Sequence, residues 1–214
     1  MRLKWQQLFP ILIILATFIL AFSLYSELPA FMASHWGING QADGFMPKNK
    51  ALAIMPAISI ILYLLFLILP KTDPYRPSFK QFENHFNNFL VVVFGFLFYL
   101  FCLMLYWNLG NQFNMGQALA PAFSIMFYFT GVLTSVARRN WFVGIRTPWT
   151  MSSDEVWDKT HQLGGRLYKI AAAVSLLGVV FPDISFYLVI GPILLVTVFI
   201  FIYSYVQHTK LTRS

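Results

Sequence analysis

Six long apolar runs, separated by short polar segments, most constrain what this chain can form. Crossing the hydrocarbon core of a bilayer as an α-helix takes roughly 20 apolar residues. The runs cover about 8–24, 51–69, 86–107, 119–137, 167–180 and 186–206, and the fifth is the shortest, with an apolar core over 170–181. We therefore expect an all-α membrane protein with six transmembrane helices and no separate soluble domain.

The composition supports this class. Of the 214 residues, 58% are hydrophobic and only 11% are charged, whereas soluble domains carry about 25% charged residues. The single cysteine, Cys102, lies inside the third run, so an intramolecular disulfide is excluded.

The distribution of Lys and Arg predicts the orientation of the helices. With six spans, one side of the membrane collects thirteen of the fifteen basic residues, and the other side holds only Lys48 and Lys50. Basic residues accumulate on the cytoplasmic side because their translocation is disfavoured. Both termini, including Arg2 and Lys4, and the central polar stretch are therefore predicted to be cytoplasmic. The net charge of +7 is interpreted as topology, and we expect no direct binding of nucleic acid.

The first run has an alternative interpretation as a secretory signal peptide. It follows a short basic start, and residues 30–33 contain alanines that resemble a weak cleavage site. The run is long for a signal core, and an uncleaved helix that starts in the cytoplasm fits the charge distribution, so we favour a retained first span.

None of the apolar cores contains Asp, Glu, Lys or Arg. Charged residues inside the membrane are typical of proton relays and ion-coupled transport, so their absence disfavours a secondary transporter.

The loop after the first span, 34–50, is predicted to lie outside the cell and to fold back on itself. It contains Asn39-Gly40 and Asp43-Gly44, and both dipeptides favour tight turns. A recognition surface and a simple turn with interfacial aromatic residues remain equal alternatives. The candidates for recognition are His35, Trp36, Asp43 and Phe45. His35 and Asp43 lack a third ligand in this loop, so we expect no metal site.

Residues 138–168 form the polar centre of an otherwise apolar chain. Pro148 disfavours helical backbone at Thr147, so the fourth span should end before it. Ser152, as N-cap, and Glu155 match a capping box. We expect a short amphipathic cytoplasmic helix from about Ser153 that bends at Gly164-Gly165 into the fifth span.

Arginines and aromatic residues alternate in the first part of this stretch, NWFVGIRTPWT. Such a mixture can bind anionic headgroups, whereas positive-inside anchoring explains each residue singly. His161 has no nucleophile beside it at a recognisable spacing. We therefore expect no enzymatic activity and no cofactor.

The same stretch resembles the signature of the SdpI family of bacterial immunity proteins. Residues 140–150 are similar to the family pattern N-x-x-x-G-I-R-T-x-x-T, and residues 157–161 to W-x-x-T-H. The His35-Trp36 loop is similar to a small domain of unknown function often found ahead of that signature. The signature positions are Asn140, Gly144, Arg146, Thr147, Pro148, Trp149, Thr150, Trp157, Thr160 and His161.

The resemblance implies a multi-pass protein of the bacterial plasma membrane that protects its producer from a secreted, membrane-active peptide toxin. It also implies a possible second partner, a winged-helix repressor held at the membrane. The alternative is a lipid-binding or small-molecule transport protein that contacts membrane lipids. We divide the chain into 1–70 with the outer loop, 71–137, and 138–214 with the signature.

Overall fold

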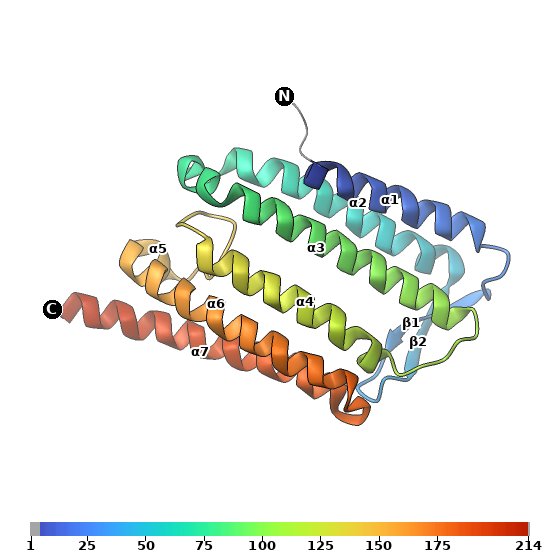
Figure 1. Cartoon of the computed structure of the whole chain (residues 1–214). Coiled ribbons are helices and arrows are strands. Elements are labelled where there is room, and N and C mark those ends of the chain that lie inside the picture. The colour runs from blue at the N-terminus through green and yellow to red at the C-terminus, as the bar shows by residue number, and fades with distance from the viewer. Residues whose placement is uncertain (1–4, 214) are drawn as a thin grey trace.

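Long helices run side by side along the molecule, and the segments that connect them lie at the two ends of the bundle (Figure 1). This is a computed structural model, and it describes residues 5–213. The predicted runs become α1 (Trp5–Ser23), α2 (Lys48–Thr72), α3 (Arg76–Asn108), α4 (Met115–Val136), α6 (Asp154–Leu176) and α7 (Ser185–Arg213). The all-α membrane class is confirmed. Arg2 and Lys4, which contribute to the predicted orientation, lie outside the described residues.

Among the described residues, five helices are long and apolar enough to cross a membrane: α1, α2, α3, α4 and α7, the last counted from Pro182. The predicted fifth span belongs to α6, whose first half is polar. Two short 3-10 turns, η1 (Leu177–Val179) and η2 (Pro182–Ile184), connect α6 to α7. The count of six spans therefore stays a prediction.

The expected bend at Gly164-Gly165 is wrong, because α6 is one continuous helix that lies along α4 (Figure 1). Both glycines are buried. A Cβ atom at Gly165 would lie 2.7 Å from Cβ of Ser135 and 2.8 Å from the carbonyl oxygen of Gly131. These glycines therefore allow two helices to approach closely, as small residues do in membrane bundles. The predicted cytoplasmic helix and fifth span are two halves of the same helix.

The loop after α1 forms the predicted hairpin. Strands β1 (Phe31–Trp36) and β2 (Ala42–Pro47) pair in antiparallel register, with Met32 opposite Met46. Gly40 in the turn has a φ of 75°, a conformation that glycine adopts at little cost.

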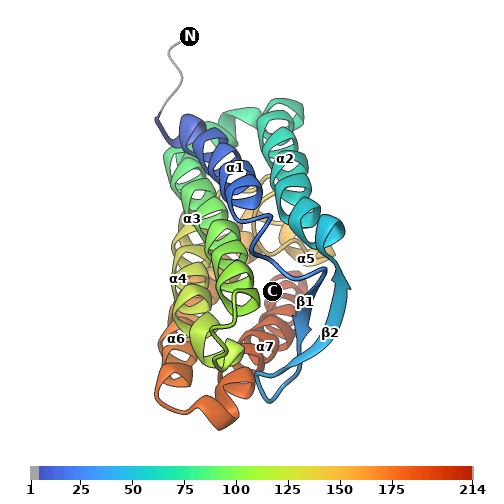
Figure 2. The ribbon, with the colours of Figure 1, turned by 90° about the vertical axis from the view of Figure 1, so that its right-hand side faces the viewer.

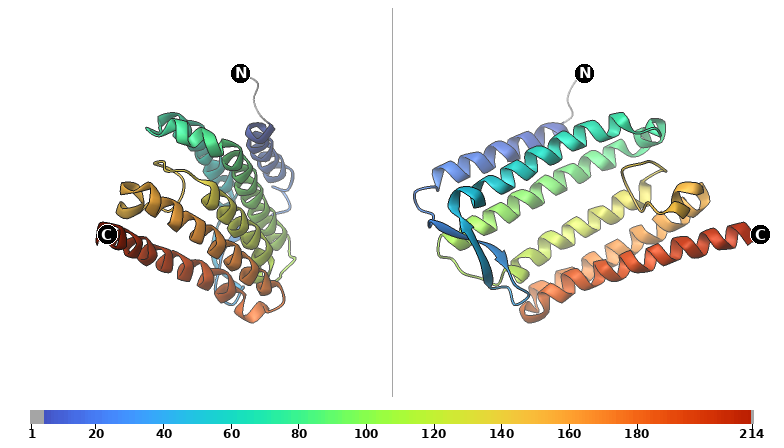
Figure 3. Two further views of the ribbon diagram at one scale, coloured as in Figure 1. Left: turned by 60° about the vertical axis from the view of Figure 1, so that its left-hand side comes forward. Right: turned by 180° about the vertical axis from the view of Figure 1, so that it is seen from behind.

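Asn108 at the end of α3 fixes the hairpin to the bundle. Its side-chain oxygen accepts a hydrogen bond from the Ala33 N–H at 2.7 Å, and its amide group donates to the Ala33 carbonyl at 3.0 Å. Trp36 also packs edge-on against Trp107, with ring centroids 5.9 Å apart. The hairpin therefore has a defined position, at the end of the bundle opposite to α5 (Figures 1 and 3).

The helices form two groups that meet along α3 and α4. The first group is α1, α2 and α3, and the second is α4, α6 and α7 (Figure 2). The view from behind shows α2 and α7 in front, with α3 and α4 between and behind them (Figure 3). The division at residues 70 and 137 stays a prediction.

Candidate functional site

Residues 138–147, which we call the signature loop, connect α4 to the short helix α5 (Pro148–Ser152). Asn140 organises the first part of this loop and is fully buried. Its amide group donates to the carbonyls of Arg138 and Val143, and its oxygen accepts from the N–H groups of Phe142 and Val143 at 2.8 and 2.7 Å. One side chain thus replaces several backbone contacts of a regular turn.

His161 of α6 holds the second part of the loop. Its Nε2 accepts a hydrogen bond from the Ile145 N–H at 2.9 Å, and its Nδ1 lies 2.8 Å from the Trp157 carbonyl. Since a carbonyl only accepts, Nδ1 carries the proton and the ring is neutral. Both ring nitrogens are engaged by the backbone, so this histidine acts as a structural clasp.

Burial lowers the pKa of His161 to about 4, and its hydrogen bond to Trp157 opposes this shift. His161 lies in the polar first half of α6, before the apolar segment that begins at Ile170. The clasp is therefore uncharged throughout the physiological pH range.

Gly144 makes room for this contact. Its φ is 113°, which L-residues with a side chain rarely adopt. A Cβ atom at this position would also collide with Nε2 of His161. Glycine is therefore required both by the positive φ of the backbone and by the contact between His161 and the loop.

Trp157 lies beneath His161 and ties α6 to the end of α4. The two rings are stacked with centroids 3.8 Å apart, and the indole N–H donates to the Ala137 carbonyl at 2.8 Å. Thr160 is also fully buried, and its hydroxyl has no hydrogen-bond partner among the described residues. These positions are parts of the packed core.

Thr147 and Thr150 form a capping box at the start of α5. The Thr147 N–H donates to Oγ1 of Thr150 at 2.9 Å, and the Thr150 N–H donates to Oγ1 of Thr147 at 3.2 Å. Pro148 occupies the first turn, where no N–H is required. The Thr147 hydroxyl also reaches Ser204 of α7 at 3.1 Å. Trp149 packs between Phe201 and Tyr205 of the same helix.

The predicted N-cap at Ser152 is wrong, because α5 already includes that residue. Ser153 caps α6 instead, and its hydroxyl accepts from the Val156 N–H at 3.3 Å. Glu155 pairs with Lys159 at 2.7 Å rather than closing a capping box.

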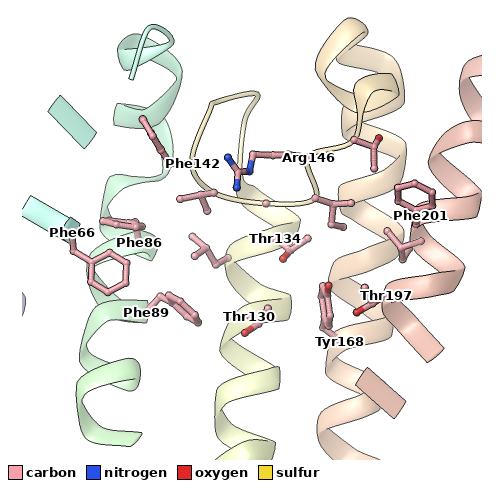
Figure 4. Close-up of a pocket in the computed structure, with 16 residues that line it drawn as sticks. Phe66, Phe86, Phe89, Thr130, Thr134, Phe142, Arg146, Tyr168, Thr197 and Phe201 are labelled. Carbon is pink, nitrogen blue, oxygen red and sulfur yellow. The ribbon is translucent and has the colours of Figure 1, made fainter. Parts of the chain in front are cut away.

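Arg146 differs from the other signature residues. Its guanidinium donates only to the Trp141 carbonyl, and it has no carboxylate partner in the part of the chain that the structure describes. Arg138 and Arg139, by contrast, pair with Asp158 and Asp154 at 3.4 and 3.0 Å. Arg146 instead lines a cavity of about 450 Å³ beneath the loop (Figure 4).

Three of the four outer candidates are exposed, and two of them meet. Nδ1 of His35 lies 2.5 Å from a carboxylate oxygen of Asp43 across the hairpin. Phe45 is 60% exposed. Trp36 points instead toward Trp107 and packs against the cluster around Met32. Residues 5–213 hold no group of three metal-ligating side chains.

Sequence reasoning missed two features of this end of the bundle. Asp73, at the turn between α2 and α3, is buried and accepts from the Trp141 N–H at 3.1 Å, so it also anchors the signature loop. Its position before Pro74 signals only a turn. The cavity was also missed, because its lining comes from helices that are far apart in the sequence.

Comparison with known proteins agrees with the sequence pattern. Residues 136–204 match the model of the SdpI/YfhL protein family, and residues 12–60 match a domain of unknown function (DUF1648). The chain is 23% identical over 210 residues to Immunity protein SdpI of Bacillus subtilis (strain 168), covering 98% of this chain and 99% of that protein. No solved structure matches the chain at a significant level. The resemblance expected from the signature is confirmed.

Proposed function

We propose that this chain, whose residues 136–204 match the model of the SdpI/YfhL protein family, is an immunity protein of the bacterial plasma membrane. It protects its producer from a secreted, membrane-active peptide toxin. The observation that carries this proposal is the similarity to Immunity protein SdpI over almost the whole length of both chains.

The outer hairpin is the surface that we assign to the toxin. Its position is fixed by the two hydrogen bonds between Asn108 and Ala33, so little order has to be gained on binding. His35, Asp43 and Phe45 offer a polar pair beside an exposed aromatic ring, and aromatic residues are common in binding hot spots. Trp36 supports this surface from below.

The winged-helix repressor is assigned to the opposite end of the bundle. Most signature residues there are buried or bonded to the backbone, so they shape the docking surface rather than form it. Trp141, which is 50% exposed, is the residue that such a partner would contact.

A toxin titration tests the immunity function. Expression in a toxin-sensitive strain is expected to shift the killing curve to higher toxin concentrations. Phe45→Ala should lose about tenfold of this protection, the effect of one hot-spot side chain. The matched control is Phe22→Ala, because Phe22 is 87% exposed on α1 but lies outside the hairpin. Unchanged killing with the wild-type chain would remove the immunity proposal. Equal protection by Phe45→Ala and the wild type would remove only the hairpin as the contact surface.

A further inference from the structure

The cavity beneath the signature loop has no role in the proposed toxin contact. It lies between α2, α3, α4, α6 and α7, and the signature loop covers one end (Figure 4). Its volume of about 450 Å³ falls within the range of small-molecule sites, roughly 300–1,000 Å³. Helices α2 and α7, which both contribute lining residues, lie on the same side of the bundle (Figure 3).

The walls below the loop are apolar. Phe66 of α2 and Phe86 and Phe89 of α3 form one side, and Ile200 and Phe201 of α7 contribute to the other. Four threonines also line the cavity: Thr130, Thr134, Thr147 and Thr197. The hydroxyls of Thr130 and Thr197 donate to the carbonyls of Met126 and Ile193 in their own helices, and that of Thr147 bonds to Ser204. These three hydroxyls therefore present little hydrogen-bonding capacity to a ligand.

Arg146 supplies the one cation in the lining. Figure 4 shows its guanidinium at the loop end of the cavity, above Phe86 and Thr134. The nearby arginines are already paired with aspartates. An unpaired guanidinium beside apolar walls favours an anion, and its planar donors match the oxygens of a phosphate.

The order of these groups along the helices matches the shape of a lipid. Thr130 lies six residues before the end of α4 at Val136, which places it about 9 Å deeper than that end. The cation is thus at the level of the charged end of the bundle, and the apolar walls extend towards the membrane centre. Anionic lipids are attracted to such basic ends.

We propose that this cavity binds one anionic phospholipid of the surrounding bilayer, with its phosphate on Arg146 and an acyl chain between α2, α3 and α7. The inference does not rest on the immunity function, and a failed toxin titration leaves it intact. The bound lipid fills the space between the two helix groups and fixes the signature loop from below.

Native mass spectrometry of the full chain tests this site. The protein is equilibrated in mixed micelles of phosphatidylglycerol and phosphatidylcholine, and retained lipid is counted per chain. The wild type is expected to retain one phosphatidylglycerol in preference to phosphatidylcholine. Arg146→Ala should reduce this occupancy about tenfold, the effect of one charge-assisted contact. Arg138→Ala is the matched control, since it removes the same charge nearby but outside the cavity, and it should retain the lipid.

A second variant keeps the test decisive if Arg146→Ala does not fold. Thr130→Phe fills the cavity without changing any charge, and it should lose the bound phosphatidylglycerol as well. Equal retention in Arg146→Ala or Thr130→Phe and the wild type would overturn the proposal. So would an equal loss in Arg138→Ala, because binding would then depend on overall charge alone.

Discussion

Replacement of His161 by alanine is expected to release the signature loop from α6. The substitution removes the acceptor of the Ile145 N–H and the ring that stacks on Trp157. An orphaned buried donor costs about 1–3 kcal/mol, and the lost packing adds to this, so we expect a destabilisation of about 3 kcal/mol. Thermal unfolding in detergent micelles measures it. His35→Ala, at the exposed hairpin, is the control and should leave the unfolding temperature nearly unchanged.

The same clasp predicts a pH dependence of stability. Because the folded state holds the pKa of His161 at about 4, below its ordinary value near 6.5, the unfolded chain takes up a proton first as the pH falls. The stabilisation is complete above pH 6.5 and is lost progressively down to about pH 4, by up to about 3 kcal/mol. The unfolding temperature of the wild type should therefore fall between pH 7 and pH 4. The unfolding temperature of His161→Ala should lack this contribution to the fall. An equal fall of the unfolding temperature in both proteins would show that another titratable group is responsible.

Gly144→Ala is expected to be the most damaging small substitution in the loop. A non-glycine residue at a φ of 113° costs about 1–3 kcal/mol, and its Cβ would also displace Nε2 of His161. Gly110→Ala is a matched control, because Gly110 has a φ of 98° but no atom within 4 Å of the added Cβ. Gly110→Ala should therefore show only the destabilisation that comes from the positive φ of the backbone.

A double variant separates the two causes. In the His161→Ala background the clash is absent, so Gly144→Ala should cost less there than in the wild type. Strictly additive effects would mean that Gly144 and His161 do not depend on each other.

The sequence was informative wherever a pattern was local. Apolar runs located every long helix, because the bilayer requires a continuous apolar stretch, and Asn39-Gly40 predicted the hairpin turn. The polar stretch around Arg146 was selected because charged and aromatic residues concentrate there in an otherwise apolar chain. Patterns of this kind depend only on neighbouring residues.

Errors arose where tertiary contacts decided between local alternatives. Ser152 and Ser153 are equally suitable caps, and the α5 capping box made by Thr147 and Thr150 settles the choice. Gly164-Gly165 suggested a bend, but packing against Gly131 and Ser135 explains the glycines without one. Nothing in the local pattern predicted that Asn140 and His161 bond to the backbone of the signature loop, because these contacts form only in the folded structure.

The two ends of the bundle are assigned to opposite sides of the membrane. The hairpin is assigned to the cell exterior and the signature loop to the cell interior. Single cysteines at Gln41 and Ser152, both exposed, test this assignment in a Cys102→Ala background. A membrane-impermeant maleimide added to intact cells should label Gln41→Cys and should label Ser152→Cys only after permeabilisation. Labelling of Ser152→Cys in intact cells, with Gln41→Cys protected, would contradict the account.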